Sequence, residues 1–439
     1  MTKLASFPNN PRRLVLFGLA AGAAQMAGCG GGGGDLAGLG SGGTGSFTTG
    51  VITSLGSIIV NGVRYDDSGI TPERADDDST LRSLIPGMVV SVEGTERTEP
   101  TVLGQLPASR ASRITYGSEW KGPVDGISRT TTTDPITAEA RTTGTFTILG
   151  QTVKVTEATK FIHSDDNPGT TTRSFVDLQP SPAQYVEVYG FVDPATDQLQ
   201  ATLIEIKNSR PDTYRLSGKL SEFSSSVTGG TARLATGPRI SWASTDVVES
   251  GITAGAFVKV RLNPDPVGAV YAATRIRKPS VQTPKGVDYK QYKTEIEGLV
   301  TEFSSPSSFS VNGLPVIVPA GIPSEGTLRA GAIVEVYGTI KDGTVVATKI
   351  EVKSGFDRNT PFFGSVISVD LDRRKFILRP VGISTPSQDQ TFTYTAETEF
   401  EDRLRPENLT NVASPNKVKV KAARSDSGYR ALKIELEKD

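Results

Sequence analysis

The chain has 439 residues, more than one small domain needs, and a formal net charge of -1 at neutral pH. This near-neutral balance provides no basic field that would attract nucleic acid or an anionic membrane surface. Only 36% of the residues are hydrophobic, whereas 46 are glycine and 27 are proline, a composition typical of short strands joined by many turns.

The N-terminus has the pattern of a secretory signal peptide over residues 1–28. Lys3, Arg12 and Arg13 form a basic start, and the apolar stretch at 14–24 is too short to span a bilayer. The stretch ends in small residues, as signal peptides do before their cleavage site. The Arg12-Arg13 pair leaves open whether export uses the general secretory or the twin-arginine route.

The chain contains a single cysteine, and its position at the end of the signal peptide indicates its role. The segment Met26-Ala27-Gly28-Cys29 resembles the lipobox of bacterial lipoproteins, with Met26 where that family prefers leucine. The resemblance implies cleavage before Cys29, acylation of that residue and stable anchoring by several acyl chains. By the sorting rule of that family, Gly30 in place of an aspartate implies the outer membrane, with the body facing the periplasm or the cell surface.

A flexible tether is expected over residues 29–47. This glycine- and serine-rich stretch has too little apolar surface to build a core. Its glycine run does not indicate a phosphate-binding loop, since no strand precedes it and no Gly-Lys-Ser/Thr follows it.

Three kinds of segment then recur in the same order five times. Each repeat opens on a glycine followed by alternating apolar residues, at Gly50, Gly122, Gly218, Gly298 and Gly364. Valine-alternating segments follow at 88–93, 185–189, 257–261, 333–337 and 417–421, and closing segments at 111–114, 201–206, 273–276, 347–352 and 431–436. The repeats are too long for a solenoid, so each is a domain by itself. The predicted domains are 48–119, 120–213, 214–282, 295–355 and 361–439, with a linker over 283–294.

Within each repeat the pattern predicts an antiparallel sheet. In the fourth, Val334 and Val336 alternate with Glu335, so one face of the strand is buried and the other is wet. Asn312-Gly313 is a strong hairpin signal, and Asn61-Gly62 repeats it in the first domain. Five strands with the long connection after the third give the order of a small OB-type barrel, with its usual helix shortened or missing. The predicted fold class is therefore all-β, a tandem array of OB-like barrels or, alternatively, of open β-sandwiches.

The repeats resemble a bacterial family, the domain of unknown function 5666. The resemblance lies in Gly-Leu-Val-Thr-Glu-Phe at 298–303, Ser-Phe-Ser-Val-Asn-Gly at 308–313, Gly-Ala-Ile-Val-Glu-Val-Tyr-Gly at 331–338 and Val-Ala-Thr-Lys-Ile-Glu at 346–351. It extends over most of residues 48–439, best in the first and fourth domains and loosest in the third and fifth. It implies an exported protein with tandem β-domains and, because the family has no established activity, no functional residues.

No catalytic constellation is predicted. His163 is the only histidine and lies where a strand is expected to meet a polar turn, so neither a Ser-His-Asp nor a Cys-His mechanism is expected. One histidine and an acylated cysteine do not supply a zinc site. The acidic runs Asp76-Asp77-Asp78 and Asp165-Asp166 lack the ligand spacing of a calcium loop, and we interpret them as solvated loop tips. We predict neither a metal site nor a cofactor.

Two further features point weakly to carbohydrate. Trp120 and Trp242 could stack on sugars, but single tryptophans in β-domains more often cap a core, and we expect the latter. The chain has 48 acidic residues, so their number alone does not exclude a carboxylate pair for glycoside hydrolysis. Such an enzyme needs a deep cleft, which small domains with short loops rarely form.

The sequence thus favours a non-catalytic array, anchored in a membrane through Cys29, that binds an envelope protein or polysaccharide and not nucleic acid. Tandem weak modules would gain avidity together. A purely structural envelope spacer is the first alternative, and a carboxylate-dependent envelope hydrolase is the second. The ligand, the oligomeric state and the rigidity of the array stay open.

The lipoprotein prediction is tested by Cys29→Ala. We expect this variant to keep its folded body but to leave the membrane, or to retain an uncleaved signal peptide, because the acyl acceptor is lost. Membrane fractionation and mass spectrometry of the N-terminus measure both effects. Wild-type protein found in the soluble fraction with an unmodified thiol would contradict the prediction.

Overall fold

The computed structural model describes residues 45–54, 57–75, 83–98, 106–133, 140–164, 173–180, 184–193, 195–207, 209–279, 293–322, 324–353, 360–380, 389–411, 418–425 and 428–436. They belong to one compact unit, residues 43–439. Their regular elements are β-strands and short 3-10 turns, and no helix among them is long and apolar enough to cross a membrane. Outside the described residues lie the predicted signal peptide, Cys29, the tether up to residue 44, Asp76-Asp77-Asp78, Asp165-Asp166 and residues 283–292 of the linker.

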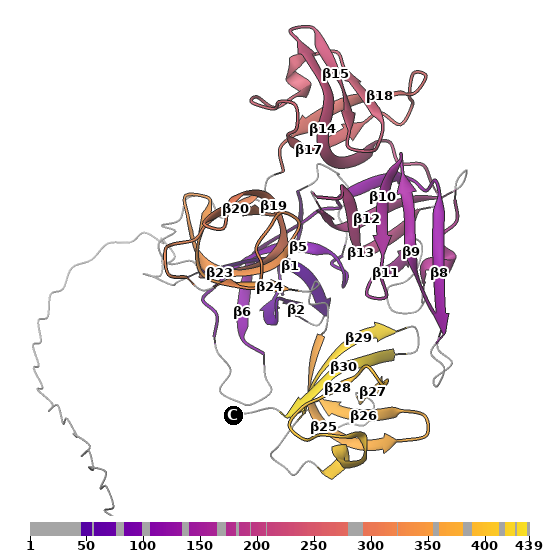
Figure 1. The fold of residues 1–439 in the computed structure, drawn as a ribbon, viewed down its shortest axis with the longest axis vertical. Helices are drawn as coiled ribbons and strands as arrows, with labels where there is room; N and C mark the ends of the chain where they lie inside the picture. The colour runs from indigo at the N-terminus through magenta and orange to yellow at the C-terminus, as the bar shows by residue number, and fades with distance from the viewer. Residues whose placement is uncertain are drawn as a thin grey trace, which may run out of the picture. The chain divides into compact units, whose positions relative to one another are not determined.

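The first domain is a closed five-stranded barrel (Figure 1). Its main strands are β1 (Ser46–Ser54), β2 (Ile58–Val60), β3 (Val63–Asp66), β5 (Val89–Gly94) and β6 (Ala108–Tyr116). β1 pairs antiparallel with β2 and β5, β2 with β3, and β5 with β6, while parallel pairing of β3 with β6 closes the barrel. This is the five-stranded Greek-key order of the OB fold, so the predicted barrel is confirmed and the open sandwich is not.

Domains three, four and five close in the same way, through parallel pairing of β16 with β18, β21 with β24 and β27 with β30. Domain three has β14 (Tyr214–Ser226), β15 (Gly229–Leu234), β16 (Arg239–Trp242), β17 (Phe257–Leu262) and β18 (Val270–Arg277). Domain four has β19 (Lys293–Ser305), β20 (Ser308–Val311), β21 (Leu314–Ile317), β23 (Ile333–Lys341) and β24 (Thr344–Lys353). Domain five has β25 (Thr360–Asp370), β26 (Lys375–Pro380), β27 (Gln390–Thr393), β29 (Val418–Ser425) and β30 (Gly428–Leu436).

Domain two is the same barrel with an interrupted first strand. Its strands are β7 (Trp120–Pro123), β8 (Ile127–Thr133), β9 (Ala140–Ile148), β10 (Gln151–Val155), β12 (Tyr185–Asp193) and β13 (Gln198–Lys207). β7 pairs with β12 on one side of the break, and β8 pairs with β9 on the other. Parallel pairing of β10 with β13 then closes the barrel as in the other domains.

Among the described residues, the connection after the third strand carries only short elements in every domain. In four domains it contains a short strand parallel to the last one: β4 (Glu73–Arg74), β11 (Lys160–His163), β22 (Ser324–Glu325) and β28 (Glu399–Phe400). Three domains also carry a 3-10 turn there: η1 (Phe175–Asp177), η2 (Thr245–Val247) and η5 (Pro406–Asn411). The expected shortening of the barrel helix is confirmed in the described residues.

Three element boundaries differ from the sequence-based prediction. β1 begins at Ser46, so the last residues assigned to the tether belong to the barrel, and Phe47 is 1% exposed in the core of domain four. The low-complexity composition of the preceding stretch masked this short apolar alternation. β19 begins at Lys293 and β25 at Thr360, each within two residues of the expected start.

In domains one and four, the opening glycine of the repeat has a steric cause. The hairpin turns place Asn61 and Asn312 in the left-handed region, with φ of 48° and 51°, and their side chains fold over the first strand. An added Cβ at Gly50 would lie 2.1 Å from Asn61 Oδ1, and one at Gly298 would lie 2.1 Å from Asn312 Nδ2. The Asn side chain of the hairpin therefore packs against the first strand only where that strand has a glycine.

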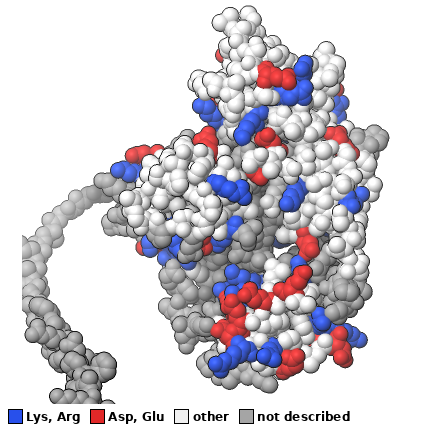
Figure 2. Space-filling view, viewed as in Figure 1, with Lys and Arg blue, Asp and Glu red and all other residues white. Residues whose placement is uncertain are grey.

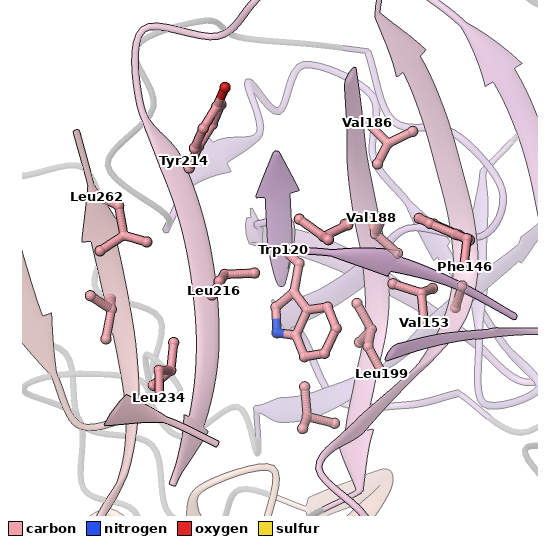
Figure 3. Close-up of a cluster of buried hydrophobic side chains, with 14 of the residues drawn as sticks. Trp120, Phe146, Val153, Val186, Val188, Leu199, Tyr214, Leu216, Leu234 and Leu262 are labelled. Atoms are coloured by element: carbon pink, nitrogen blue, oxygen red, sulfur yellow. The ribbon is translucent and has the colours of Figure 1, made fainter. Parts of the chain in front are cut away.

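Domains two and three share a continuous apolar core. In Figure 3, the Trp120 ring lies between Leu199 and Val153 of domain two and Leu216 of domain three. The Trp120 indole N–H donates to Ser217 Oγ at 2.9 Å, which joins β7 to β14. These two barrels are therefore packed together rather than strung as separate modules.

Domain one is joined to domains two and four. β1 and β19 pair in parallel, from Ser46 opposite Lys293 to Thr49 opposite Ile296. Val51 of β1 and Leu299 of β19 pack with Phe191 of β12, so three domains meet at one apolar contact. The first four barrels therefore pack against one another.

Gly298→Ala tests the contact between the first strand and the hairpin. Its Cβ would displace the Asn312 side chain, which donates to the Glu297 carbonyl and accepts from the Leu299 amide. We expect a loss of about 1–3 kcal/mol in stability, measured by thermal unfolding. Gly126→Ala is the control, because its Cβ would meet Thr147 Oγ1 at an ordinary 3.6 Å. Equal stability of the two variants would contradict this account.

Candidate functional site

An open cavity lies where the first four domains meet. Its volume is about 340 Å³, which is within the range of small-molecule sites. Strands β1 and β5 of domain one, β12 of domain two, and β14, β17 and β18 of domain three contribute most of its lining. Figure 2 shows acidic and basic side chains interspersed over the face in view, so any local excess of charge must come from particular residues.

The lining of the cavity is basic. Among the described residues that form it, six are cationic, and Glu119 is the single acid. The cations are Arg215, Lys259, Arg261, Arg275, Arg277 and Lys278. Since the whole chain is almost neutral, this is a local concentration of positive charge.

Strand register places five of these cations in two rows across domain three. Arg215 of β14 lies opposite Arg261 of β17, and Arg261 lies opposite Arg275 of β18. In the second row, Lys259 of β17 lies opposite Arg277 of β18. Directly opposed residues share a face of the sheet, and like charges in such pairs are destabilising. The two rows therefore lie on one face of the sheet.

Burial, an ion pair and a hydrogen bond hold two of these cations, Arg215 and Lys259, in place. Arg215 is buried, with 5% of its surface exposed. Lys259 Nζ lies 2.6 Å from one Glu119 carboxylate oxygen, and the other oxygen accepts from the Ser217 hydroxyl at 2.6 Å. Because Ser217 also accepts from the Trp120 indole, the face is tied to the shared core of domains two and three.

The first row continues into domain two, where it ends on an acidic residue, Glu187. Lys121 of β7 is next in the row and lies opposite Glu187 of β12. Glu187 is bound by Arg74 of domain one at 2.5 Å and by Lys207 at 3.0 Å. Burial would raise the pKa of Glu187, but Lys207 and Arg74 hold that pKa below its usual value. This end of the row is a compensated contact between domains.

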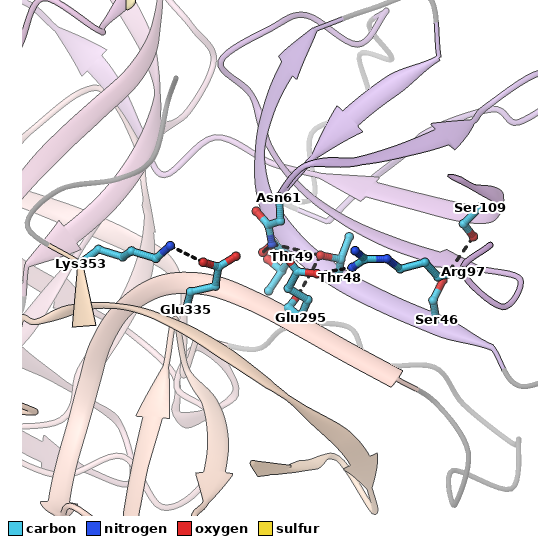
Figure 4. A network of polar contacts seen from close by, with 9 residues as sticks. All are labelled: Ser46, Thr48, Thr49, Asn61, Arg97, Ser109, Glu295, Glu335 and Lys353. Carbon is cyan, nitrogen blue, oxygen red and sulfur yellow. Dashed lines mark hydrogen bonds and ion pairs between the residues drawn. The ribbon is translucent and has the colours of Figure 1, made fainter. Parts of the chain in front are cut away.

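A second polar cluster lies where β1 meets β19 (Figure 4). The Thr48 hydroxyl donates to the Glu295 backbone carbonyl at 2.7 Å, and Arg97 donates to an oxygen of the Glu295 carboxyl group at 3.0 Å. Glu335 of β23 lies close to the Glu295 carboxyl and forms an ion pair with Lys353. The cluster thus joins domain one to domain four.

The Glu295 carboxyl of this cluster binds its proton unusually tightly. Burial raises the pKa of Glu295 to about 9, and the hydrogen bond and charge of Glu335 act in the same direction. A carboxyl group with a raised pKa can also serve in acid-base catalysis. Here the side chains are 12% and 11% exposed and do not line the cavity, so we interpret the pair as structural.

The residues singled out from the sequence lie in ordinary structural positions. His163 ends β11, as expected, and is half-buried. Trp120 and Trp242 are 0% and 5% exposed, which confirms that both belong to cores. Within the part of the chain that the structure describes, no three His, Cys, Asp or Glu side chains are grouped as a metal site requires.

The sequence analysis missed the cationic rows, although one signal was present. The residue between the valines of the middle segment is Glu187 in domain two and Glu335 in domain four, but Lys259 in domain three and Lys419 in domain five. Aligning the repeats position by position would have shown this change of sign. The opposition of Arg215 and Arg261 required the strand register.

Comparison with known protein families shows which family three of the repeats resemble. The family model described as Domain of unknown function (DUF5666) matches residues 135–205, 297–351 and 364–435, which lie in domains two, four and five. The chain is thus a repeat protein with DUF5666-like domains. The fourth domain was expected to match well and does. The first, also expected to match well, is not among the matched segments, whereas the fifth, expected to be loose, is.

The other comparisons do not indicate a function for this chain. No curated protein matches the chain. Among solved structures, Drosophila Unr CSD456 is similar with 12% identity over 50% of this chain and 94% of that chain, at a TM-score of 0.13. So low a score carries no argument, and the OB-like assignment depends on the strand order above.

Glu295→Gln tests the buried carboxyl pair through pH. The folded protein holds this proton with a pKa of about 9. The unfolded chain releases it near the usual glutamate value, ~4.3. Wild-type stability should therefore fall as pH rises through that interval, by up to ~1.4 kcal/mol per pH unit. The variant should lose this slope and be the more stable protein near the upper end, in thermal unfolding across the interval.

The control for this test is Glu351→Gln. The Lys349 ammonium, by its hydrogen bond, holds the pKa of Glu351 below its usual value. That variant should not gain stability relative to wild type as pH rises. An unchanged pH slope in the Glu295→Gln variant would contradict the assignment of the proton.

Proposed function

We propose that this protein is a non-catalytic binding protein of the bacterial envelope, held at the outer membrane through lipidated Cys29. Its partner is an envelope protein or polysaccharide. The observation that carries the proposal is the basic cavity, which residues of several domains build together. A site formed jointly by packed repeats explains why the domains occur in tandem, in addition to the avidity that separate modules would offer.

A structural spacer is the second candidate. The pairing of β1 with β19 favours it, because this pairing joins two barrels edge to edge. A spacer, however, needs neither a cavity nor a concentration of cations around it. Binding accounts for these features, and spacing does not.

A carboxylate-dependent hydrolase has less support. The one acid among the described cavity residues, Glu119, is held by Lys259 and by the Ser217 hydroxyl. A catalytic carboxylate pair needs two acids on either side of the substrate. The Glu295 and Glu335 pair lies in the contact between domains one and four instead.

Anchoring and location depend on the N-terminal sequence, in which the lipobox follows a signal-like segment. An exported body meets the proteins and polysaccharides of the envelope, and nucleic acid is not among its ordinary partners. A lipid anchor also keeps the cavity close to a surface, where weak binding is strengthened by local concentration.

Pull-down from envelope extract tests this function. The tagged full chain, solubilised in detergent, is the bait, and polysaccharide arrays are probed in parallel. We expect a partner that saturates and is competed away by untagged protein. If no partner is retained at micromolar bait, binding is contradicted and the spacer is favoured.

A further inference from the structure

One strand of domain two has an edge that no other described strand covers. β8 pairs with β9 along its inner edge, from Ile127 opposite Phe146 to Thr133 opposite Ala140. It is the last strand of its sheet, and in Figure 1 it lies at the outer margin of domain two, beyond β9. Every residue from Ser128 to Thr133 is exposed. In the part of the chain that the structure describes, the outer edge of β8 is therefore open to a further strand.

We propose that this edge binds the β8 strand of a second copy of the chain, in antiparallel orientation. The two copies then form one continuous sheet, in the order β9-β8-β8-β9. The inference goes beyond the proposed function and does not depend on it, because none of the β8 residues lines the cavity.

The β8 edge lacks the irregularity that the same hairpin has in the other domains. The first hairpin of domains one, three, four and five contains a register shift, for example between Ile52 and Ser54 of β1. Such bulges twist an edge and hinder its pairing with another strand. β8 and β9 instead keep one register through all seven of their residue pairs. Domain two therefore presents a regular edge of the kind that accepts a further strand.

The side chains of β8 do not protect the edge either. The strand contains no proline, lysine or acidic residue, which are the residues that usually prevent pairing at an exposed edge. Its one charged residue, Arg129, donates to the Phe175 and Leu178 carbonyls and lies over the Phe175 ring. The four residues at 130–133 are β-branched and uncharged threonines. They favour an extended strand and leave its outer edge accessible.

The chain already contains one pairing of this kind between barrels. β1, the first strand of domain one, pairs edge to edge with β19, the first strand of domain four. β8 is the second part of the interrupted first strand of domain two. The pairing of β1 with β19 shows that first strands of these barrels join where an edge is open, and a second copy of β8 would repeat this behaviour between chains.

Twofold symmetry and charge select the register of the pairing. A twofold axis perpendicular to the sheet makes the two strands antiparallel and places one residue opposite itself. With Thr130 at the axis, all seven residues of β8 are paired, and Arg129 lies opposite Thr131. With Arg129 at the axis, or with parallel strands in register, two arginines would oppose each other, which is unfavourable. The uncharged threonines thus fit their own copy and provide nothing that would select a strongly acidic or basic partner.

The pairing is expected to be weak in dilute solution. A stable interface buries about 800 Å² on each partner, and a single strand of seven residues covers only part of that area. Copies held on one membrane surface, as the proposed lipid anchor implies, would meet at a raised local concentration. Self-association in solution should therefore grow with protein concentration.

Sedimentation velocity of the full chain in detergent tests for the second copy. The detergent is kept in excess, so that two chains rarely share a micelle by chance. We expect the wild-type chain to change from monomer to dimer between low and high micromolar concentration. A chain that stays monomeric over that range overturns the proposal.

Thr130→Lys places like charges opposite each other at the twofold axis. We expect at least about threefold weaker self-association, because directly opposed like charges destabilise a strand pair. A mixture of Thr130→Lys and Thr130→Glu chains should associate more strongly than either variant alone. Thr143→Lys is the matched control and should behave as wild type does, because Thr143 lies opposite Thr130 on β9, one strand away from the edge. Thermal unfolding checks that all three variants are folded.

Cysteine cross-linking tests the register. Thr130→Cys should form a disulfide-linked dimer under mild oxidation, because the two copies of position 130 face each other within reach of a disulfide. In the same register Ser128 faces Thr132, so two copies of Ser128→Cys lie too far apart and should not cross-link. The wild-type chain, whose single cysteine is Cys29, controls for reaction of the native thiol.

The remaining outcomes separate self-pairing from other uses of the edge. Equal cross-linking at positions 128 and 130, or equal weakening by Thr130→Lys and Thr143→Lys, contradicts the proposed pairing. If the wild-type chain is monomeric but captures an envelope protein that the Thr130→Lys variant does not capture, the edge binds a foreign strand and the inference fails. A monomeric chain that retains an envelope partner leaves the proposed function standing. A chain that is monomeric and retains no partner contradicts both.

Discussion

The parallel pairing of β1 with β19 is the contact on which the arrangement of the cavity depends. In a closed barrel both edges of every strand are paired, but the first half of β1 pairs with β5 and extends beyond β2, which leaves an edge that β19 occupies. β19 offers the equivalent edge, because it is the first strand of its own barrel. The pairing inserts Phe47 into the core of domain four and brings Val51 and Leu299 against domain two. An edge that would otherwise invite association with other chains is thereby covered.

The barrels themselves were predictable because their signals are local. Alternating valines set the buried face of each middle strand, as Val334 and Val336 show, and both are fully buried. The Asn312-Gly313 turn lies between β20 and β21, as its sequence predicts, because few other residue pairs tolerate that backbone. Five such strands with one long connection leave few ways to close a sheet.

The candidate site was not predictable in the same way, because it depends on contacts between residues far apart in the chain. Arg215 is polar and charged, and nothing near it in sequence indicates that it is buried. Its opposition to Arg261 follows from the pairing of β14 with β17, and the cavity follows from packing between barrels. Sequence periodicity specifies which face of a strand is apolar, but it does not specify what covers the polar face.

The middle segment shows how one scaffold can serve two purposes. Its central residue points away from the barrel core in every repeat, so the fold tolerates either charge there. Where it is Glu187, Arg74 of a neighbouring barrel neutralises it, and the outer face is covered by packing. Where it is Lys259, the same outer face lines the cavity and gathers further cations. In domain five the same position is Lys419, which pairs with Glu435 of β30 at 3.0 Å, so the residue's neighbours and not its sign alone decide what the outer face does.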